Sequence, residues 1–261
     1  MWHDPVTMEN ARRIECCSLS NACGLSLTKD TVHVWVLNDS DVGQASATFV
    51  QTLSPDERKR AHACKRARDR DRVIARRGML RTLLGYYLDC RPECLSFGVA
   101  DFGKPFLQRE GAAQLAFNVS QSDGIALLAF AWNCHIGVDV ERPVGGFDVA
   151  GVASQIFSST ELKTLEANRS VSVDTFFSIW VRKEALLKAL GTGLYSGDLT
   201  AYTTEDDSRL GGGHWRALYN RTVVTSGWTC VDFDLRPQAR GALAVSLDGV
   251  QVSLYVCSFA P

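Results

Sequence analysis

Two carboxylates lie two positions apart in the stretch I-G-V-D-V-E-R-P, residues 136–143. Apolar residues alternate there with Gly137, Asp139 and Glu141, and a period of two is typical of a β-strand. Asp139 and Glu141 therefore point to the same side, with their Cβ atoms roughly 6–7 Å apart. Two negative charges this close repel each other, and a divalent cation between them is the usual compensation. The pattern also fits an antiparallel strand with one solvent-exposed acidic face, so a metal site needs support from a second element.

A helical stretch further along the chain supplies that second element. Residues 176–194 read F-F-S-I-W-V-R-K-E-A-L-L-K-A-L-G-T-G-L. At about 100° per residue, this stretch places an apolar stripe on one side of a helix, and Trp180, Glu184 and Lys188 follow the edge of that stripe. Glu184 and Lys188 also suit an ordinary surface ion pair between successive turns. Their position beside the buried stripe favours instead a site between two parts of the protein.

Together, the strand and the helix offer three carboxylates, Asp139, Glu141 and Glu184, to one divalent cation. Mg²⁺ prefers hard oxygen ligands and usually keeps some coordination positions for water and substrate phosphate. Lys188 or Lys183 would then meet the phosphate charge that the metal leaves uncompensated. The spacing therefore predicts a magnesium site that handles a phosphate-containing ligand.

A third feature is a strongly basic helical region between Glu57 and Arg81. It holds eleven Lys and Arg residues against three acidic ones, a net charge of +8, whereas the whole chain has a formal net charge of −1. A solvated helix face accounts for many of these residues. A polyphosphate ligand or an acidic protein partner explains the segregation better. Nucleic acid is a further alternative, but this region lacks interleaved aromatic residues on which bases could stack.

Bulk composition is that of an ordinary globular protein: 261 residues, 46% hydrophobic and 22% charged. There is no apolar run of membrane-spanning length and no apolar signal core at the N-terminus, so a cytoplasmic enzyme or binding protein is expected. The nine cysteines are odd in number and form no C-x-x-C pair, and we expect reduced thiols rather than a disulfide framework or a zinc site.

Apolar periodicity and turn signals predict a mixed α+β protein with an irregular lead-in over residues 1–30. Ser54, Pro55 and Glu57 provide a cap, an early proline and an early acid, so a helix begins there. The P-V-G-G stretch at residues 143–146 is the expected boundary between two halves. The expected helices cover residues 54–88 with a break, 159–167 and 173–190; the expected strands cover 31–37, 115–119, 125–132, 136–141, 228–235, 242–247 and 250–259, with a turn at 101–105.

I-G-V-D-V-E followed by W-V-R-K-E-A-L-L-K-A-L-G-T-G-L resembles the paired signature of the 4′-phosphopantetheinyl transferases. The likeness is closest to the larger, two-lobed type that activates peptide and polyketide synthetases. S-P-D-E-R-x-R, the R-D-R-x-x-x-x-A-R-x-x-L-R helix, G-K-P-F and F-N-V-S add support, and the resemblance runs from Ser54 to Leu194. It implies an α+β fold with two similar lobes in one chain, each a small antiparallel sheet packed with helices. The expected lobes are residues 31–143 and 144–261, and two lobes in one chain imply a monomer.

The resemblance implies a magnesium-dependent transfer of 4′-phosphopantetheine from coenzyme A to a serine of an apo acyl or peptidyl carrier protein, with release of adenosine 3′,5′-bisphosphate. Asp139, Glu141 and Glu184 would ligate Mg²⁺, or Mn²⁺ in its place. Glu184 would also act as the base for the serine hydroxyl, and Lys188 would contact the transferred phosphate. Trp180 and Lys183 would shape the pocket floor. The residues that the resemblance assigns to coenzyme A are Arg58, Arg60, Arg72, Lys104, Pro105, Ser120, Gln121, Asp139, Lys183 and Lys188.

The chain departs from the family pattern at two positions. Family members usually have S-H-S after the F-N motif, whereas this chain has S-Q-S with Gln121. Glutamine can donate a hydrogen bond but cannot carry charge, so Gln121 is expected to bind the nucleotide without a catalytic role. Glu57 stands where some relatives have a basic residue, which moves the first expected basic contact to Arg58.

Two other functions are compatible with the sequence. The basic helical region fits a non-catalytic module that binds nucleic acid, which would show a steep salt dependence and indifference to Asp139. A degenerate family member that binds coenzyme A without transferring it is the other alternative, and only the S-Q-S departure favours it.

Overall fold

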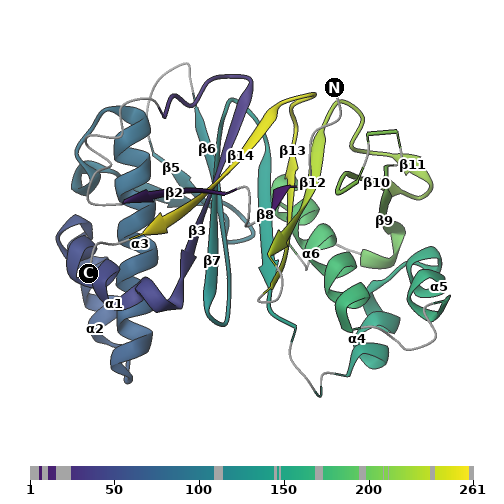
Figure 1. Ribbon diagram of the computed structural model, residues 1–261, viewed down its shortest axis with the longest axis horizontal. Coiled ribbons are helices and arrows are strands. Elements are labelled where there is room, and N and C mark those ends of the chain that lie inside the picture. The colour runs from purple at the N-terminus through teal and green to yellow at the C-terminus, as the bar shows by residue number, and fades with distance from the viewer. Residues whose placement is uncertain are drawn as a thin grey trace.

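The computed structural model describes residues 6–7, 11–15, 25–108, 114–143, 146, 148–167, 173–193, 198–207, 209–210, 212–235 and 239–258. The described α-helices come in two runs, α1 to α3 and α4 to α6, with runs of strands before, between and after them, and no closed barrel forms among the described strands (Figure 1). The helices are α1 (Val42–Phe49), α2 (Pro55–His62), α3 (Ala67–Leu88), α4 (Val149–Ile156), α5 (Ser159–Ala167) and α6 (Val173–Leu190). No helix in this part of the chain has both the length and the apolar character needed to span a lipid bilayer.

Strands of the first half are β1 (Val6–Thr7), β2 (Arg12–Glu15), β3 (Thr31–Asn38), β4 (Phe97–Val99), β5 (Pro105–Leu107), β6 (Leu115–Ser122), β7 (Ile125–Trp132) and β8 (Ile136–Glu141). Those of the second half are β9 (Tyr202–Asp206), β10 (Trp215–Tyr219), β11 (Thr222–Val223), β12 (Thr229–Leu235), β13 (Ala239–Val245) and β14 (Gln251–Ser258). The expected strands are therefore present within a few residues, and Phe259, the expected end of the last one, lies outside the described residues. The sequence did not predict helices α1 and α4, the β4–β5 hairpin or the short strands β9 to β11, and the expected irregular lead-in over residues 1–30 contains the strands β1 and β2. These elements are too short to show a clear apolar periodicity.

A five-stranded sheet in the order β2-β14-β3-β7-β6 forms the first lobe with α1 and α3. Trp35, Met79, Leu83, Phe117 and Phe130 are among the side chains that fill the core between the sheet and these helices. The strands β3, β7 and β6 pair antiparallel, whereas β14 pairs in parallel with both β2 and β3. The first lobe is thus the expected small sheet covered by helices, with two parallel pairings added.

The second lobe is a four-stranded sheet in the order β1-β12-β13-β8 covered by α6. Val181, Ala185, Ala242 and Ala244 fill the space between α6 and this sheet. The two sheets face each other across a second core, to which β3, β7, β8, β12 and β13 contribute Val34, Leu127, Val138, Phe233 and Leu243. Figure 1 shows the result, with α1 to α3 on one side of the paired sheets and α4 to α6 on the other. The predicted α+β architecture with two lobes is confirmed.

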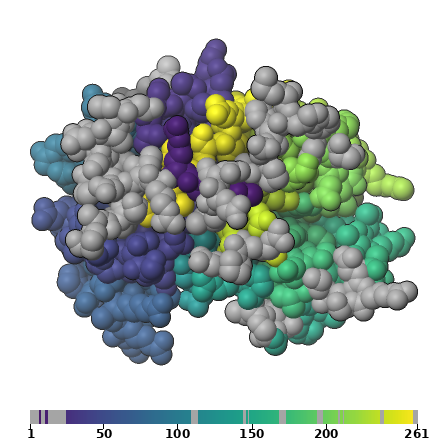
Figure 2. Space-filling view, in the orientation of Figure 1, coloured from purple at the N-terminus to yellow at the C-terminus, as the bar shows by residue number. Residues whose placement is uncertain are grey.

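Sheet membership does not follow the expected division at residues 143–146. Strand β8 precedes that point but pairs with β13 of the second half, from Ile136 with Val245 to Glu141 with Arg240. Strand β14 is the last described strand, yet it pairs with β3 of the first half. In the space-filling view, residues of the first half lie on the left and green residues of the second half on the right, with the yellow C-terminal strands between them (Figure 2). The sheet of the second lobe therefore includes β1 and β8 from the first half of the chain, and the sheet of the first lobe includes β14 from the second half.

Helix boundaries in the site region follow local sequence signals. Ser54 caps α2 in a capping box, in which its hydroxyl accepts from the N–H of Glu57 and its own N–H donates to the Glu57 carboxylate. Helix α6 ends at Leu190 and is followed by Gly191, whose φ is +73°. The N–H of Thr192 donates to the Leu187 carbonyl and that of Gly191 to the Lys188 carbonyl, the pairing of a Schellman motif. Both predicted boundaries are confirmed.

The cysteine expectation holds only in part. Cys64, Cys90, Cys94, Cys134 and Cys230 are free thiols. Cys257, in contrast, is disulfide-bonded, which the odd cysteine count and the absence of a C-x-x-C pair did not indicate.

Candidate active site

Side chains join the two sheets where the edge strand β8 runs beside the edge strand β6. Three side chains of β6 accept hydrogen bonds from three backbone N–H groups at successive alternate positions of the β8 segment. The pairs are Asn118 with Val138 (2.9 Å), Ser120 with Val140 (3.4 Å) and Ser122 with Arg142 (3.0 Å). Because both strands have a period of two, the N-x-S-x-S pattern matches every second N–H of β8. Along this edge, the side-chain oxygens of β6 accept the hydrogen bonds that the backbone carbonyls of a neighbouring strand would otherwise accept.

Two lysine ammonium groups bind backbone carbonyl groups of β8 along the same edge. The Lys104 ammonium donates to the Ile136 carbonyl at 2.8 Å, and that of Lys188 lies 3.4 Å from the Val138 carbonyl. The backbone of β8 is thus held at each even-numbered position from Ile136 onwards by a side chain of another element. With the strand fixed in this way, the odd-numbered side chains face α6.

Gly137 allows α6 to pack directly on β8. A Cβ atom at this position would lie 2.0 Å from the Ala185 carbonyl oxygen and 2.4 Å from the Ala189 nitrogen, much closer than side-chain carbons can approach. The glycine in I-G-V-D-V-E is therefore needed for close contact between strand and helix. This contact sets Glu184 and Lys188 of α6 opposite the carboxylates of β8.

Asp139 is the buried centre of the site, with 2% of its surface exposed. Its Oδ1 atom accepts hydrogen bonds from Ser120 Oγ and from Lys188 Nζ, each at 2.6 Å. Burial raises the pKa of Asp139, and the Lys188 ammonium and the Ser120 hydroxyl oppose that shift. The strand and the helix that carry the two sequence motifs are thereby joined by an ion pair.

Glu141 and Glu184 lie in the same electrostatic environment as Asp139. Burial, reinforced by the negative charges of Asp139 and Glu141, raises the pKa of Glu184 to about 7, although Lys188 acts in the opposite direction. Burial also raises the pKa of Glu141, whose carboxylate accepts from Ser122 Oγ at 2.8 Å and from the Trp180 side chain. Three acids that repel one another and a single lysine leave negative charge uncompensated, which favours a cation.

The free atoms of the cluster suit a hard divalent cation. Asp139 Oδ2 and Glu184 Oε1 are buried, and neither accepts a hydrogen bond from the described residues. Buried oxygens without donors are costly and are the ligands that Mg²⁺ prefers. As the side chains stand, no three acidic, histidine or cysteine residues in the described ranges form a coordination group. Asp139 is hydrogen-bonded to Lys188 and Glu141 to Ser122. To bind one metal ion, these two carboxylates would have to give up these hydrogen bonds and move closer together.

The basic region is partly engaged inside the molecule. Arg72 donates to Asp39 and, at 2.8 Å, to Asp123 in the turn after β6. Glu57 is buried and pairs with Arg77 and Arg81, which explains the acidic residue at this position. The remaining predicted contacts are on α2, where Arg58 is half-buried and Arg60 is exposed.

Two predicted ligands of coenzyme A have their ammonium groups turned elsewhere. Lys183 is 4% exposed and donates to Glu161 at 2.8 Å and to the Tyr202 carbonyl, within the second lobe. It is next to Glu184 in sequence but about 100° away around the helix, so the two side chains point in different directions. Lys104 donates to the backbone carbonyls of Ile136 and Lys188. The structure brings neither ammonium to the three carboxylates.

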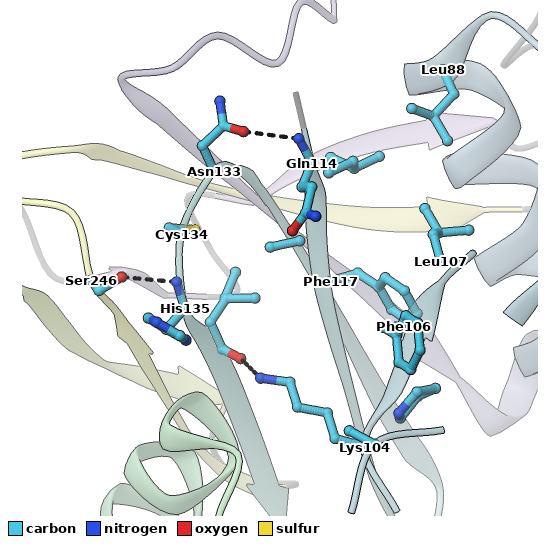
Figure 3. A pocket seen from close by; sticks show the side chains of 15 residues that line it. Leu88, Lys104, Phe106, Leu107, Gln114, Phe117, Asn133, Cys134, His135 and Ser246 are labelled. Atoms are coloured by element: carbon cyan, nitrogen blue, oxygen red, sulfur yellow. Dashed lines mark hydrogen bonds between the residues drawn. The ribbon is translucent and has the colours of Figure 1, made fainter. Parts of the chain in front are cut away.

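The other residues predicted to contact the nucleotide are on two strands: Ser120 and Gln121 on β6, and Pro105 on β5. Ser120 is buried at the centre of the cluster, whereas Gln121 is exposed on the same strand. Pro105 is half-buried at the start of β5 and, with Lys104, lines a cavity of about 560 Å³. Phe106, Cys134 and His135 line the same cavity, and the three carboxylates are not part of its wall (Figure 3). The cavity therefore adjoins the candidate site at Lys104 and at Ile136, the first residue of β8.

Sequence reasoning missed Asn118 and Ser122, which hold the β8 edge and, for Ser122, the Glu141 carboxylate. A signal was present, since N-x-S-x-S places three polar side chains on one face of a strand that otherwise reads as buried. The pattern alone did not reveal which strand these side chains would face.

Comparison with known proteins agrees with this geometry. Residues 135–246 match the model of the 4′-phosphopantetheinyl transferase superfamily. This range includes all three carboxylates and Lys188. It begins just before β8 and ends just after β13, the two strands that pair beneath α6.

Individual relatives extend the similarity. The 4′-phosphopantetheinyl transferase HetI of Nostoc is 35% identical over 176 residues, which cover 65% of this chain and 73% of HetI. The L-aminoadipate-semialdehyde dehydrogenase-phosphopantetheinyl transferase of Schizosaccharomyces pombe is 31% identical, covering 58% of this chain and 64% of that protein. The 4′-phosphopantetheinyl transferase Sfp of Bacillus subtilis is 26% identical, covering 56% and 63%. The chain thus spans slightly less than two thirds of the latter two relatives.

Proposed function

This chain belongs to the 4′-phosphopantetheinyl transferase superfamily, and from that premise we propose that it transfers the 4′-phosphopantetheine group of coenzyme A to a serine of an apo carrier protein. The enzyme class is that of its relatives, a phosphopantetheinyl transferase of the larger, two-lobed type. One observation supports the proposed reaction: the charges of Asp139, Glu141, Glu184 and Lys188 act on one another, and two buried carboxylate oxygens, Asp139 Oδ2 and Glu184 Oε1, accept no hydrogen bond from the described residues. The by-product would be adenosine 3′,5′-bisphosphate.

The three carboxylates suit one divalent cation, Mg²⁺ in the proposed reaction, with Mn²⁺ as a substitute. When bound, that ion would supply charge neutralisation for the coenzyme A pyrophosphate and polarise the phosphoryl group. Asp139 and Glu141 would hold it from the strand and Glu184 from the helix. Lys188 would be released from Asp139 to the phosphate, since its side chain is 27% exposed and can change partners.

Glu184 fits the role of general base for the carrier serine. In the reaction, the serine oxygen attacks the phosphorus next to pantetheine, and the bond to the bridging pyrophosphate oxygen breaks. The serine proton passes to the Glu184 carboxylate, directly or through water, and the bisphosphate leaves with the electron pair. Without the cation, burial raises the pKa of Glu184 to about 7. The positive charge of a bound ion would lower that pKa, so the carboxylate would be ionised and able to accept a proton at neutral pH. Positioning and charge compensation then supply most of the acceleration expected for a phosphoryl transfer.

The nucleotide end of coenzyme A would lie along β6 and the basic helices. Arg58, Arg60 and Arg72 would meet its phosphates, with Ser120, Gln121 and Pro105 near the base and ribose. Arg72 already pairs with Asp39 and Asp123, so a phosphate would compete with these carboxylates. Lys183 is left out of the proposed set, because Glu161 and the Tyr202 carbonyl enclose its ammonium.

The partner would be an acyl or peptidyl carrier protein of a polyketide, peptide or fatty acid pathway. An acidic carrier would be steered by the exposed charges of α2 and of the N-terminal part of α3. With both lobes in one chain, we expect a monomer, acting in the cytoplasm. Nucleic acid binding has less support, since Arg72, Arg77 and Arg81 pair with carboxylates of the protein itself.

A mass spectrum of apo carrier proteins tests the proposed function. Each carrier of a panel is incubated with the protein, coenzyme A and Mg²⁺, and is expected to gain one phosphopantetheine mass. A carrier with its acceptor serine replaced by alanine serves as the control and should gain nothing. Unmodified carriers throughout the panel, or full modification in excess chelator, would contradict the proposal.

A further inference from the structure

Lys104 reaches across from the first lobe to the helix and strand that carry the candidate site. Its ammonium donates to the Lys188 carbonyl of α6 at 2.6 Å and to the Ile136 carbonyl of β8 at 2.8 Å. Figure 3 shows the side chain extended towards the start of β8. One cation thus holds two backbone segments that carry different parts of the site.

The helix end is a favourable place for this cation. The Lys188 carbonyl is one of the last four of α6, which have no partner further along the helix. It accepts from the N–H of Gly191 at 3.3 Å and, in addition, from Lys104. Because the partial negative charge of a helix lies at its C-terminus, an ammonium group there is stabilised. Lys104 thereby completes the Schellman turn that ends the helix.

Lys104 itself is held on a firm support. It follows Gly103, whose φ of +83° closes the turn of the β4–β5 hairpin, and the Lys104 carbonyl accepts from the N–H of Ala100 at 2.9 Å. Phe97 of the hairpin stacks beneath the guanidinium groups of Arg77 and Arg81 at 4.9 and 5.0 Å. These contacts hold the hairpin against α3, and the hydrogen bonds of Lys104 connect the hairpin to α6 and β8.

We propose that Lys104 is a positioning residue, which clamps the last turn of α6 to the first residue of β8 and so keeps Lys188 and Glu184 in register with Asp139 and Glu141. This proposal rests on the proposed function only for its kinetic consequences, because the clamp itself is a property of the free protein. It replaces the expectation that the Lys104 ammonium binds the nucleotide.

The surroundings of Lys104 make the clamp sensitive to pH. Cys134 and His135 from the turn before β8 line the same cavity, and Lys188 on α6 directs its own ammonium to Asp139. Burial lowers the pKa of Lys104 to about 8, and Cys134 opposes the shift. The ammonium is thus charged at neutral pH and loses its proton in moderately alkaline solution, where the clamp would weaken.

Hydrogen–deuterium exchange on the free protein tests the clamp without any substrate. Lys104→Met keeps the side-chain length and removes the donors, Lys104→Arg keeps a cation at all pH values, and Lys163→Met is the control on exposed α5. We expect the amides of Gly191 and Thr192 to exchange about tenfold faster in Lys104→Met than in the wild type. Above pH 8, after correction for intrinsic exchange, the wild type should approach Lys104→Met, while Lys104→Arg stays protected. Unchanged exchange in Lys104→Met would overturn the proposal.

Kinetics separate a positioning role from nucleotide binding. A clamp predicts a fall in kcat of about 10- to 100-fold in Lys104→Met, partly restored in Lys104→Arg, with the affinity for adenosine 3′,5′-bisphosphate unchanged. If Lys104→Met instead weakens bisphosphate binding about tenfold or more at an unchanged kcat, Lys104 is a nucleotide ligand and the proposal fails. A wild-type protein without transferase activity would remove the proposed function, while the exchange experiment would still decide whether the clamp exists.

Discussion

Gly137 of β8 and Ala185 of α6 are so close that a Cβ atom on the glycine would stand 2.0 Å from the Ala185 carbonyl oxygen. Ala185 directly follows Glu184 in α6, and Gly137 is two residues before Asp139 in β8. The contact therefore sets the distance between the helix that carries Glu184 and the strand that carries Asp139 and Glu141. A backbone carbonyl cannot move aside as a flexible side chain can, and any larger residue must push the helix away from the strand.

Replacement of this glycine should therefore damage both stability and activity. We expect Gly137→Ala to lower the free energy of unfolding by about 3 kcal/mol, the upper end of the usual range for overpacking in a dense core. Urea unfolding monitored by circular dichroism gives the value. Gly43 in α1 is the matched control, since a Cβ there meets nothing within 4 Å; Gly43→Ala should stabilise by about 0.5–1 kcal/mol. Equal effects of the two substitutions would contradict the close contact.

Loss of one carboxylate should remove turnover and leave the fold intact. We expect Asp139→Asn and Glu184→Gln to lower kcat by about 10²–10³-fold, the cost of deleting a main electrostatic group, with Tm within a few degrees of the wild type. Each variant should also bind Mn²⁺ more weakly, as measured by electron paramagnetic resonance without coenzyme A. Glu166→Gln on the exposed side of α5 is the control and should leave both readouts unchanged. Normal Mn²⁺ affinity in both site variants would remove the metal assignment.

His33 should make the protein less stable in mildly acidic solution. Burial lowers its pKa from 6.5 to about 4, and its Nδ1 atom lies 2.9 Å from the Tyr87 hydroxyl. Between pH 4 and 6.5 the unfolded chain binds a proton at this residue that the folded protein does not. Stability from this group is fully present above pH 6.5 and falls as the pH drops towards 4, by about 3 kcal/mol.

The matching experiment compares unfolding free energies of the wild type and His33→Gln at pH 7 and pH 4.5. The difference between the two pH values should be smaller in the variant, because the titrating group is gone. His62 on α2 is the control position. An identical pH dependence in wild type and His33→Gln would show that His33 does not titrate in this range.

Glu57 should be a stability residue and not a ligand site. Its carboxylate receives hydrogen bonds from the N–H of Ser54 and from Arg77 and Arg81, and the residue is 7% exposed. Removal of one partner from a buried ion pair costs about 3–5 kcal/mol, because the remaining charges lose their compensation. We expect Glu57→Ala to show a loss of this size in thermal unfolding, and Asp56→Ala, one residue earlier, to cost less than about 1 kcal/mol. A loss of coenzyme A affinity without a loss of stability would contradict this role.

Local signals in the sequence were enough to predict the start of α2, the end of α6 and the main strands, but not the short helices α1 and α4. Ser54 and Glu57 form the capping box that the S-P-D-E stretch indicates, and Gly191 ends α6 as its spacing after Leu190 suggests. The two motifs, whose combination resembles one family, also predict that the three carboxylates share one site; that metal site stays a prediction, and the structure joins the strand and the helix by the Asp139–Lys188 ion pair. These features depend on residues within a few positions of one another, or on a recurrent pair of motifs.

Features that depend on distant partners could not be predicted in the same way. The alternation in β8 shows that Val138 and Val140 are buried, but not that β13 is the neighbour of this strand. Helix geometry separates the direction of Lys183 from that of Glu184, but the sequence does not show that Glu161 of the second lobe is the partner of Lys183. The roles of Asn118 and Lys104 likewise required knowledge of which backbone edge lies opposite them.

The exchange of β8 and β14 between the lobes has a consequence for how this protein assembles. A fragment ending near Pro143 would lack the C-terminal strand that closes its own sheet and would carry β8 without the β13 surface that β8 needs. Neither part can complete its hydrophobic interior alone, so the two must condense together in one cooperative step. Fragments made separately should be soluble only as a mixed pair, and cleavage in the connecting segment should be tolerated only while both pieces stay interlocked.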